Sequence, residues 1–298
     1  MGLRGPRPGK HMCRFVGYLG PPVSLEGLLY GPPFGLWRQA WAPRCQQFGN
    51  VNADGWGVGW YDRAIRAEPA RYRTVTPIWA DRNFAEIAPL LSSDCAIAAI
   101  RDASPGIPVD QSSTAPFTSG QVLFAHNGLI ERFREGASSE LRRRIGPRRE
   151  SEIIGGSDSE VVFALLLGYL DKLSFFEGAT VGSRRGAAGT GGEARDLSVA
   201  TQPAARWRGL LLAAAIRETI DELRSVAAGR FNLVVSDGGS MVASAAGDRL
   251  FALSSEVEGS QVTQVASEPF DDDPAWFEVP PEHLLIATHE EPAHLVAI

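Results

Sequence analysis

Lysine is nearly absent from this 298-residue chain, in which Lys10 and Lys172 are the only two. Arginine supplies the rest of the 29 basic residues, and 35 acidic residues outnumber them to give a formal net charge of −6. Proteins that bind nucleic acid carry a basic face or stripe, which this balance does not favour. No nucleic-acid partner is therefore expected, and the excess of arginine is most simply a coding preference.

Cysteine and histidine are also few. The three cysteines, Cys13, Cys45 and Cys95, form no CxxC pair, and the five histidines show no HxH or HExxH spacing. Metal sites rely on such spacings, so the sequence predicts neither a metal nor a cofactor. An odd number of cysteines indicates reduced thiols, which favours a cytoplasmic location.

Long apolar runs are missing as well. No stretch approaches the roughly 20 apolar residues of a membrane helix, and no apolar segment follows the basic opening MGLRGPRPGKH. The Gly-rich residues 178–194 lack the GK[ST] ending of a phosphate-binding loop. Membrane insertion, secretion and nucleotide binding are thus not expected, and residues 178–194 are typical of a flexible insertion.

Short apolar strands that end in polar residues recur through the first half of the chain. A strand is expected from Cys13 to Leu19, followed by a helix that Ser24 can cap. The segment Gly57 to Tyr61 alternates as a strand does, and CAIAAIRDAS predicts a buried strand that ends at Arg101. The segment QVLFAHNG predicts a strand that runs into a His-Asn-Gly turn.

The second half combines two helices with further strands. Ser157 or Asp158 can cap an amphipathic helix that carries Glu160 in its first turn, and a second helix is expected over 207–227. The segment FNLVVSDGGSMVASAAG predicts a hairpin about residues 237–239. This order of elements predicts a single α+β domain in which helices lie on packed sheets.

Cys13 stands at the head of the first strand and directly after a methionine. If Met12 is an initiator that is removed, Cys13 gains a free α-amine. The reference pKa of such an amine is about 7.7 to 8.0, so it can act as the base for the neighbouring thiol. In the alternative interpretation, Met12 is an ordinary internal residue and Cys13 is a small buried side chain.

Three further positions could serve the hydrolysis of an amide. Asn127 and Gly128 together offer a side-chain amide and a backbone N–H to a developing oxyanion. Arg101 could bind a substrate carboxylate, and Asp158 could bind a substrate ammonium. Each has a structural alternative, because Asn-Gly favours plain turns, Arg101 could form an ion pair at the core edge, and Asp158 could only cap a helix.

The order of these segments resembles a known family. The chain is similar to the class II glutamine amidotransferase domain, of N-terminal-nucleophile hydrolase type, at MCRFVGYLG (12–20), NADGWGVGWY (52–61), IRDASPG (100–106), AHNG (125–128) and SDSE (157–160). The resemblance implies a four-layer αββα sandwich, with two antiparallel sheets packed between helices. It also implies that Cys13 is the nucleophile and, through its amine, the base, while Asn127 and Gly128 form the oxyanion hole.

The resemblance further assigns the residues that bind the substrate. Arg101, helped by Ser104, would hold the carboxylate of the γ-glutamyl group, and Asp158 would bind its α-ammonium. The segment RDAS departs from the family pattern of Arg, any residue, Ala and Thr. Ser104 keeps the hydroxyl, but Asp102 places an acid beside Arg101, which we expect to weaken the binding of the carboxylate.

The domain organisation follows from the extent of the resemblance. It runs in outline from Cys13 to the C-terminus, whereas residues 133–156 and 177–206 match none of its segments. We expect one domain over 12–298 with flexible insertions at these two places. Residues 1–11 would block the amine of Cys13, so they are expected to be non-native or removed.

A chain of this length leaves no room for the synthase domain of a large amidotransferase. Its single-domain layout, with PPVSLEGLLYGPP and QAWAPR, resembles the branch that cleaves a γ-glutamyl amide in ergothioneine biosynthesis. The implied small-molecule substrate carries a trimethylammonium betaine, which Trp56 could contact through a cation–π interaction, with Trp37, Trp41 and Trp60 as alternatives. A glutaminase subunit that supplies ammonia to a separate synthase and an inactive regulatory relative are the alternative functions, and the oligomeric state is open.

Overall fold

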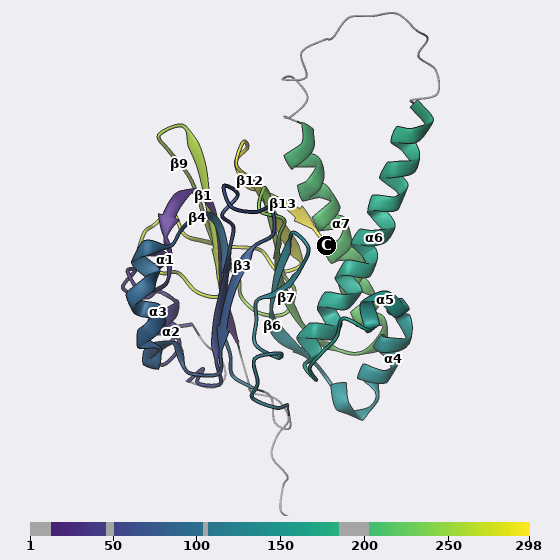
Figure 1. Cartoon of the computed structure of the whole chain (residues 1–298), viewed down its shortest axis with the longest axis horizontal. Coiled ribbons are helices and arrows are strands. Elements are labelled where there is room, and N and C mark those ends of the chain that lie inside the picture. The colour runs from purple at the N-terminus through teal and green to yellow at the C-terminus, as the bar shows by residue number, and fades with distance from the viewer. Residues whose placement is uncertain (1–12, 46–50, 104–106, 185–202) are drawn as a thin grey trace, which may run out of the picture.

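The computed structural model describes residues 13–45, 51–103, 107–184 and 203–298, and two antiparallel sheets form its centre (Figure 1). The first sheet contains β1 (Arg14–Ser24), β2 (Trp56–Trp60), β3 (Ala70–Thr74), β4 (Ser92–Ile100), β9 (Phe251–Val257), β10 (Ser260–Ala266) and β11 (Phe277–Glu278). Its strands are ordered β11-β9-β10-β1-β4-β2-β3. The nucleophile candidate, Cys13, thus directly precedes a strand at the middle of this sheet.

The second sheet contains β5 (Phe117–Ser119), β6 (Val122–Ile130), β7 (Gly229–Ser236), β8 (Ser240–Ala245), β12 (His283–Thr288) and β13 (His294–Ala297). Its strands are ordered β13-β12-β8-β7-β6-β5. The helices are α1 (Leu25–Leu29), α2 (Leu36–Gln39), α3 (Arg82–Ile87), α4 (Ala137–Arg144), α5 (Pro147–Glu150), α6 (Asp158–Arg184) and α7 (Pro203–Val226).

The elements stack as four layers. Helices α1, α2 and α3 cover the outer face of the first sheet, and α4 to α7 lie on the outer side of the second sheet (Figure 1). Three separate apolar clusters fill the spaces between the layers, represented by Leu28 and Trp56, by Phe15 and Ala125, and by Leu166 and Ile216. The expected αββα sandwich with two antiparallel sheets is confirmed.

Alternation along the strands decides which side chains enter the space between the sheets. In β1, Phe15 and Leu19 belong to the central cluster, whereas Val16 and Tyr18 belong to the cluster under α1 to α3. Successive side chains of a strand point to opposite faces. The odd-numbered positions at the start of β1 therefore face the second sheet.

Several local features predicted from the sequence, namely a helix cap, a hairpin turn and a helix start, are present in the structure. The Ser24 hydroxyl accepts the N–H of Gly27 and caps α1. The Asp237 carboxylate accepts the N–H groups of Gly239 at 3.0 Å and Ser240 at 2.8 Å in the turn between β7 and β8. Asp158 begins α6, as predicted.

The expected His-Asn-Gly turn is wrong. Residues 126–128 lie inside β6 and pair with Leu233, Asn232 and Phe231 of β7. Asn and Gly favour turns locally, but the neighbouring strand β7 supplies a continuous ladder of partners that overrides this preference.

The two expected insertions differ in what the structure describes. Residues 133–156, which were expected to be a flexible insertion, include the helices α4 and α5 and bury Leu141 and Arg149. Of residues 177–206, the described ends continue α6 and begin α7, and 185–202 lie outside the described residues. The expected leader, 1–11, also lies outside them.

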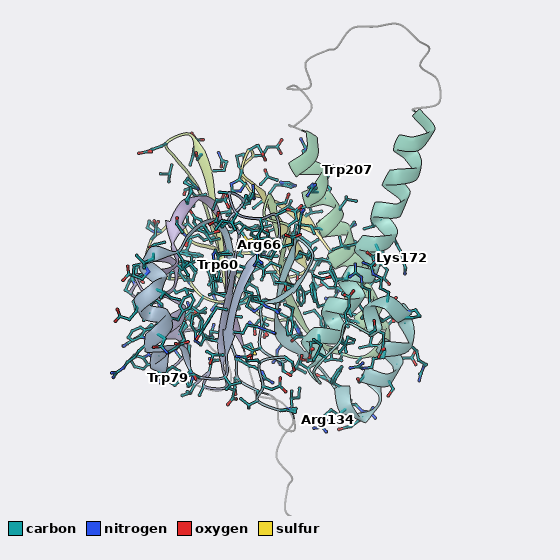
Figure 2. The ribbon with its side chains drawn as sticks, viewed as in Figure 1. Trp60, Arg66, Trp79, Arg134, Lys172 and Trp207 are labelled. Atoms are coloured by element: carbon teal, nitrogen blue, oxygen red, sulfur yellow. The ribbon has the colours of Figure 1, made fainter. Side chains whose placement is uncertain are left out.

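The long helices lie on the outer side of the second sheet. Lys172 on α6 places its ammonium 4.6 Å from the ring centroid of Tyr169, and Trp207 lies near the start of α7 (Figure 2). None of the helices within the described ranges is long and apolar enough to cross a membrane.

Candidate active site

Cys13, Arg101 and Asn127 project into the space between the two sheets. Phe15 belongs to the central cluster, so Cys13, two residues before it, faces the same side. By the same alternation, Ile97 and Ala99 of β4 place Arg101 on the inner side. Leu123 and Ala125 of β6 do the same for Asn127 from the opposite sheet.

Cys13 lies beside the backbone that follows β4. Its thiol donates a hydrogen bond to the carbonyl oxygen of Asp102 over 3.8 Å. Burial raises the pKa of the Cys13 thiol to about 11, although the cation of Arg101 acts in the opposite direction. The thiol is therefore neutral at pH 7, and a base must take its proton before it can attack a carbonyl.

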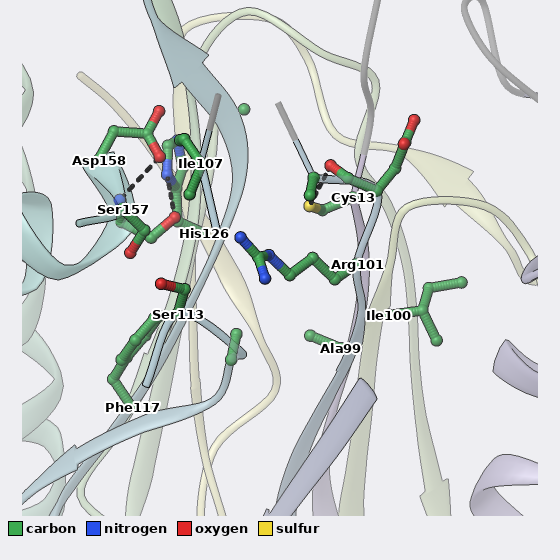
Figure 3. A pocket seen from close by; sticks show the side chains of 15 residues that line it. Cys13, Ala99, Ile100, Arg101, Ile107, Ser113, Phe117, His126, Ser157 and Asp158 are labelled. Atoms are coloured by element: carbon green, nitrogen blue, oxygen red, sulfur yellow. Dashed lines mark hydrogen bonds between the residues drawn. The ribbon is translucent and has the colours of Figure 1, made fainter. Parts of the chain in front are cut away.

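The guanidinium of Arg101 points into a cleft that Cys13 lines on one side and Asp158 on the other (Figure 3). One of its nitrogens, Nη2, donates to the carbonyl of Pro108 at 3.0 Å. The other, Nη1, is buried and has no hydrogen-bond partner among the described residues. A buried guanidinium nitrogen without an acceptor can bind a carboxylate that enters the cleft.

The NADG segment holds the backbone on either side of this arginine. Arg101 donates its backbone N–H to the carbonyl of Gly55 at 2.9 Å. Asp54 donates its backbone N–H to the carbonyl of Arg101 at 3.0 Å. The Asp54 carboxylate accepts the N–H of Ala103 at 2.8 Å. Gly55 has φ +117° and an added Cβ would lie 2.6 Å from the Thr74 carbonyl, so only glycine fits there.

Asp158 lies at the first position of α6, across the cleft from Cys13 (Figure 3). Its two carboxylate oxygens accept the N–H groups of Ile130 at 3.1 Å and Ser159 at 2.9 Å. Each oxygen retains a further lone pair, because an ionised carboxylate has about four acceptor sites. Asp158 can therefore keep its bonds to Ile130 and Ser159 and bind a substrate ammonium at the same time.

A capping box fixes the start of α6. The Ser157 hydroxyl accepts the N–H of Glu160 at 3.3 Å and donates to its carboxylate at 3.1 Å. That carboxylate also accepts the N–H of Gly155 at 2.8 Å. These reciprocal bonds set the position of Asp158 within the helix's first turn.

Gly128 lines the cleft, and Asn127 is buried beside it with 1% of its surface exposed. The N–H of Phe231 in β7 donates to the carbonyl of Ala246, which directly follows β8, so this N–H points toward β8 and not toward β6. In an antiparallel pair, this turns the N–H of the opposite residue, Gly128, away from β7. Because β5 pairs with β6 only as far as Phe124, that N–H lies beyond the β5 ladder.

Gly128 also allows a close approach of two strands. A Cβ there would collide with the backbone carbonyl of Arg230, so no other residue fits without moving β7. The amide of Asn127 donates from Nδ2 to the hydroxyl of Ser267 at 3.3 Å. Its Oδ1 is buried and has no partner among the described residues.

Sequence reasoning missed several residues of the cleft. Ser113, Ser157 and Ser159 line it, as does His126. The Nε2 of His126 bonds to the carbonyl of Arg230 at 3.0 Å, and its Nδ1 to the hydroxyl of Ser159 at 3.1 Å. Since a carbonyl only accepts, Nε2 carries a proton, and both nitrogens serve structural bonds. Alternation along β6 places His126 on the face opposite Asn127, toward Ser159 of α6, so the strand pattern by itself gives no signal that His126 borders the cleft.

Trp56 does not reach the cleft, which corrects its expected role as a substrate contact. It is fully buried on the outer face of the first sheet, where its indole N–H donates to Asp81 at 3.2 Å and its ring meets Phe84 edge to face. Alternation along β2 turns the Trp56 side chain away from the space between the sheets. Among the described residues, no tryptophan lines the cleft. Ser104 lies outside the described residues.

The cleft encloses about 560 Å³, counting the part open to solvent. It combines a thiol with a cation, Arg101, and an anion, Asp158, which match the two charges of a free amino-acid head. Within the described part of the chain, no three His, Cys, Asp or Glu side chains form a metal-binding group.

Known proteins are similar to this chain in sequence and in fold. Residues 36–183 match the family model described as class-II glutamine amidotransferases. The γ-glutamyl-hercynylcysteine sulfoxide hydrolase of Mycobacterium tuberculosis is 35% identical over 280 residues, which cover 94% of each chain. The enzyme of that name from Mycolicibacterium smegmatis is 35% identical over 275 residues, 92% of this chain and 95% of that one.

A solved structure supports the fold independently. The glutamine aminotransferase class-II domain protein from Silicibacter pomeroyi superposes with a TM-score of 0.59 and 22% identity. The match covers 96% of this chain and 99% of that chain.

Proposed function

Because the chain belongs to the class-II glutamine amidotransferases, we propose that it hydrolyses the γ-glutamyl amide bond of γ-glutamyl-hercynylcysteine sulfoxide. The products are glutamate and hercynylcysteine sulfoxide. The two mycobacterial enzymes named for this reaction match more than nine-tenths of the chain at 35% identity. The observation that carries the proposal is the cleft itself, in which the thiol of Cys13 and the charges of Arg101 and Asp158 line one space.

The charged side chains would orient the γ-glutamyl head. Arg101 binds its α-carboxylate through Nη1, which has no partner within the described part of the chain, and Asp158 binds its α-ammonium. The γ-carbonyl then reaches back toward Cys13, on the opposite side of the cleft. Fixing both charges of the head in this way places the carbonyl within reach of the nucleophile.

In the proposed reaction, Cys13 is the first residue of the active enzyme, and residues 1–12, the initiator Met12 included, are absent from it. The α-amine of Cys13 takes the thiol proton, and the thiolate attacks the γ-carbonyl carbon. The oxyanion accepts hydrogen bonds from the Asn127 amide and the Gly128 N–H. The leaving amine departs with a proton, and water hydrolyses the γ-glutamyl thioester to release glutamate and restore Cys13.

The test is a comparison of substrates with enzyme that starts at Cys13. Glutamate release is measured from γ-glutamyl-hercynylcysteine sulfoxide and from glutamine, and mass spectrometry establishes the N-terminus of the protein made from its natural gene. The proposal predicts a higher kcat/KM for the sulfoxide. Faster turnover of glutamine would instead identify a glutaminase subunit, and no turnover of either would identify an inactive relative.

A further inference from the structure

Ser267 directly follows β10 and connects the strand of the nucleophile to Asn127. Its hydroxyl accepts the N–H of Phe15 at 3.1 Å and the Nδ2 of Asn127 at 3.3 Å. Phe15 lies two residues after Cys13 in β1, whereas Asn127 lies in β6 of the other sheet. One buried hydroxyl, with 5% of its residue exposed, thus bridges the two sheets at the cleft.

This bridge replaces an ordinary bond of the β1–β10 ladder. Val16 pairs with Ala266, so Phe15 and Ser267 are the next pair along. Ser267 donates its N–H to the Phe15 carbonyl at 3.1 Å, as the ladder requires. The Phe15 N–H, however, goes to the Ser267 hydroxyl, and the Ser267 carbonyl accepts from the guanidinium of Arg14 at 3.3 Å instead.

The Asn127 amide turns its NH₂ end toward the Ser267 hydroxyl. The serine oxygen accepts from both the Phe15 N–H and Asn127 Nδ2 and so uses its two lone pairs. In this arrangement the amide presents its NH₂ end to the strand that follows Cys13. Nδ2 carries a second hydrogen, which leaves one donor for an oxyanion formed at the thiol.

We propose that Ser267 is a positioning residue, which holds the Asn127 amide in the orientation that an oxyanion donor needs and fixes it relative to Cys13. This inference rests on the proposed function. Ser267 does not line the cleft and does not touch the substrate, so it acts only through Asn127 and Phe15. Without the hydroxyl, the amide can rotate and present Oδ1, which repels an oxyanion.

The experiment compares two serine variants. Ser267→Ala is expected to lower kcat about tenfold or more while KM changes less than about twofold, because the lost interaction acts in the transition state. Ser267→Thr keeps the hydroxyl and is expected to recover most of the loss. The matched control is Ser93→Ala, which also removes a buried hydroxyl that accepts a backbone N–H, from Tyr61 at 3.2 Å. Ser93 lies at the opposite end of β4, so its loss should reduce Tm and leave kcat unchanged.

A double-mutant cycle separates this role from a general loss of structure. In an Asn127→Ala background, Ser267→Ala should change kcat less than about twofold, because the group it orients is gone. A normal kcat for Ser267→Ala, or its full effect in the Asn127→Ala background, would overturn the proposal. If Asn127→Ala itself has normal kcat, the oxyanion assignment fails first, and the two failures are thereby distinguished.

Discussion

Cys13 and Arg101 lie side by side at the ends of neighbouring strands. The β1–β4 register pairs Arg14 with Ile100, and one step further along it brings Cys13 opposite Arg101. The cation of Arg101 favours the thiolate of Cys13, but burial has the larger effect and leaves the thiol pKa at about 11. The same arginine has a buried nitrogen, Nη1, without an acceptor among the described residues. This geometry favours the proposed role of Arg101 in binding the substrate over a role in activating the nucleophile.

Removal of the thiol tests the nucleophile. Cys13→Ala should abolish turnover and leave Tm nearly unchanged, because one small, half-buried side chain is lost just before a strand. Cys45→Ala is the matched control, since Cys45 is also free and half-buried but does not line the cleft. Residual turnover by Cys13→Ala at more than a trace would exclude it as the nucleophile.

The pH dependence tests the base. In a chain that retains residues ahead of Cys13, the thiol ionises only near its pKa of about 11. Alkylation of Cys13 by iodoacetamide should then rise through pH 9 and 10 and level off above 11. In the enzyme that begins at Cys13, kcat/KM should instead rise near pH 8, the reference range of an α-amine. A rise near pH 11 in both forms would remove the amine as the base.

Truncation of the oxyanion donor has a predicted size. Asn127→Ala should lower kcat by about 100- to 1000-fold, the cost of losing one preorganised donor. The variant should still bind substrate, so KM is expected to change little. Steady-state kinetics and Tm on the same preparation separate the two effects. A near-normal kcat in a folded variant would dismiss this role.

The charge of Asp158 can be tested with little change in shape. In Asp158→Asn, the amide oxygen can still accept the Ile130 N–H, whereas the bond from the Ser159 N–H and the negative charge are lost. The value of kcat/KM should fall about 10- to 100-fold, as for loss of a hydrogen bond to a charged group. A glutaryl analogue that lacks the α-amine serves as the control. Wild type and variant should hydrolyse it equally, and a clear difference between them would contradict a contact with the ammonium.

Trp56 is expected to affect stability and not catalysis. Trp56→Phe removes the hydrogen bond to Asp81 and part of a fully buried ring. The free energy of unfolding should fall by about 1 to 3 kcal/mol, while KM and kcat stay within about twofold. Denaturant unfolding and kinetics on the sulfoxide provide both readouts. A severalfold rise in KM with unchanged stability would restore Trp56 as a substrate contact.

The predictable parts of this fold rest on local signals. Ser24 caps the first helix and Asp237 closes the β7–β8 turn through bonds to residues within three positions, which a single sequence displays. The start of α6 is also local, since Ser157 and Glu160 bond to each other. Such interactions need no knowledge of the rest of the chain.

The parts that were missed depend on distant pairing. Residues 126–128 favour a turn by themselves, and only β7, about a hundred positions later, makes them a strand. The contact between Asn127 and Ser267 joins residues 140 positions apart. The expected substrate contact of Trp56 is wrong for the same reason. Strand alternation shows which face Trp56 occupies only when the register of β2 with β4 is known, and that register pairs Trp56 with Ile100.

The central space between the sheets also limits how this site can change. Cys13, Arg101 and Asn127 each face the space between the sheets, because they stand at odd positions whose neighbours two residues away fill the central cluster. Substitution can alter the chemistry of the cleft one side chain at a time. A shift of any of these strands by a single residue would turn its side chain to the other face of the sheet, and the nucleophile, the cation and the amide would no longer meet.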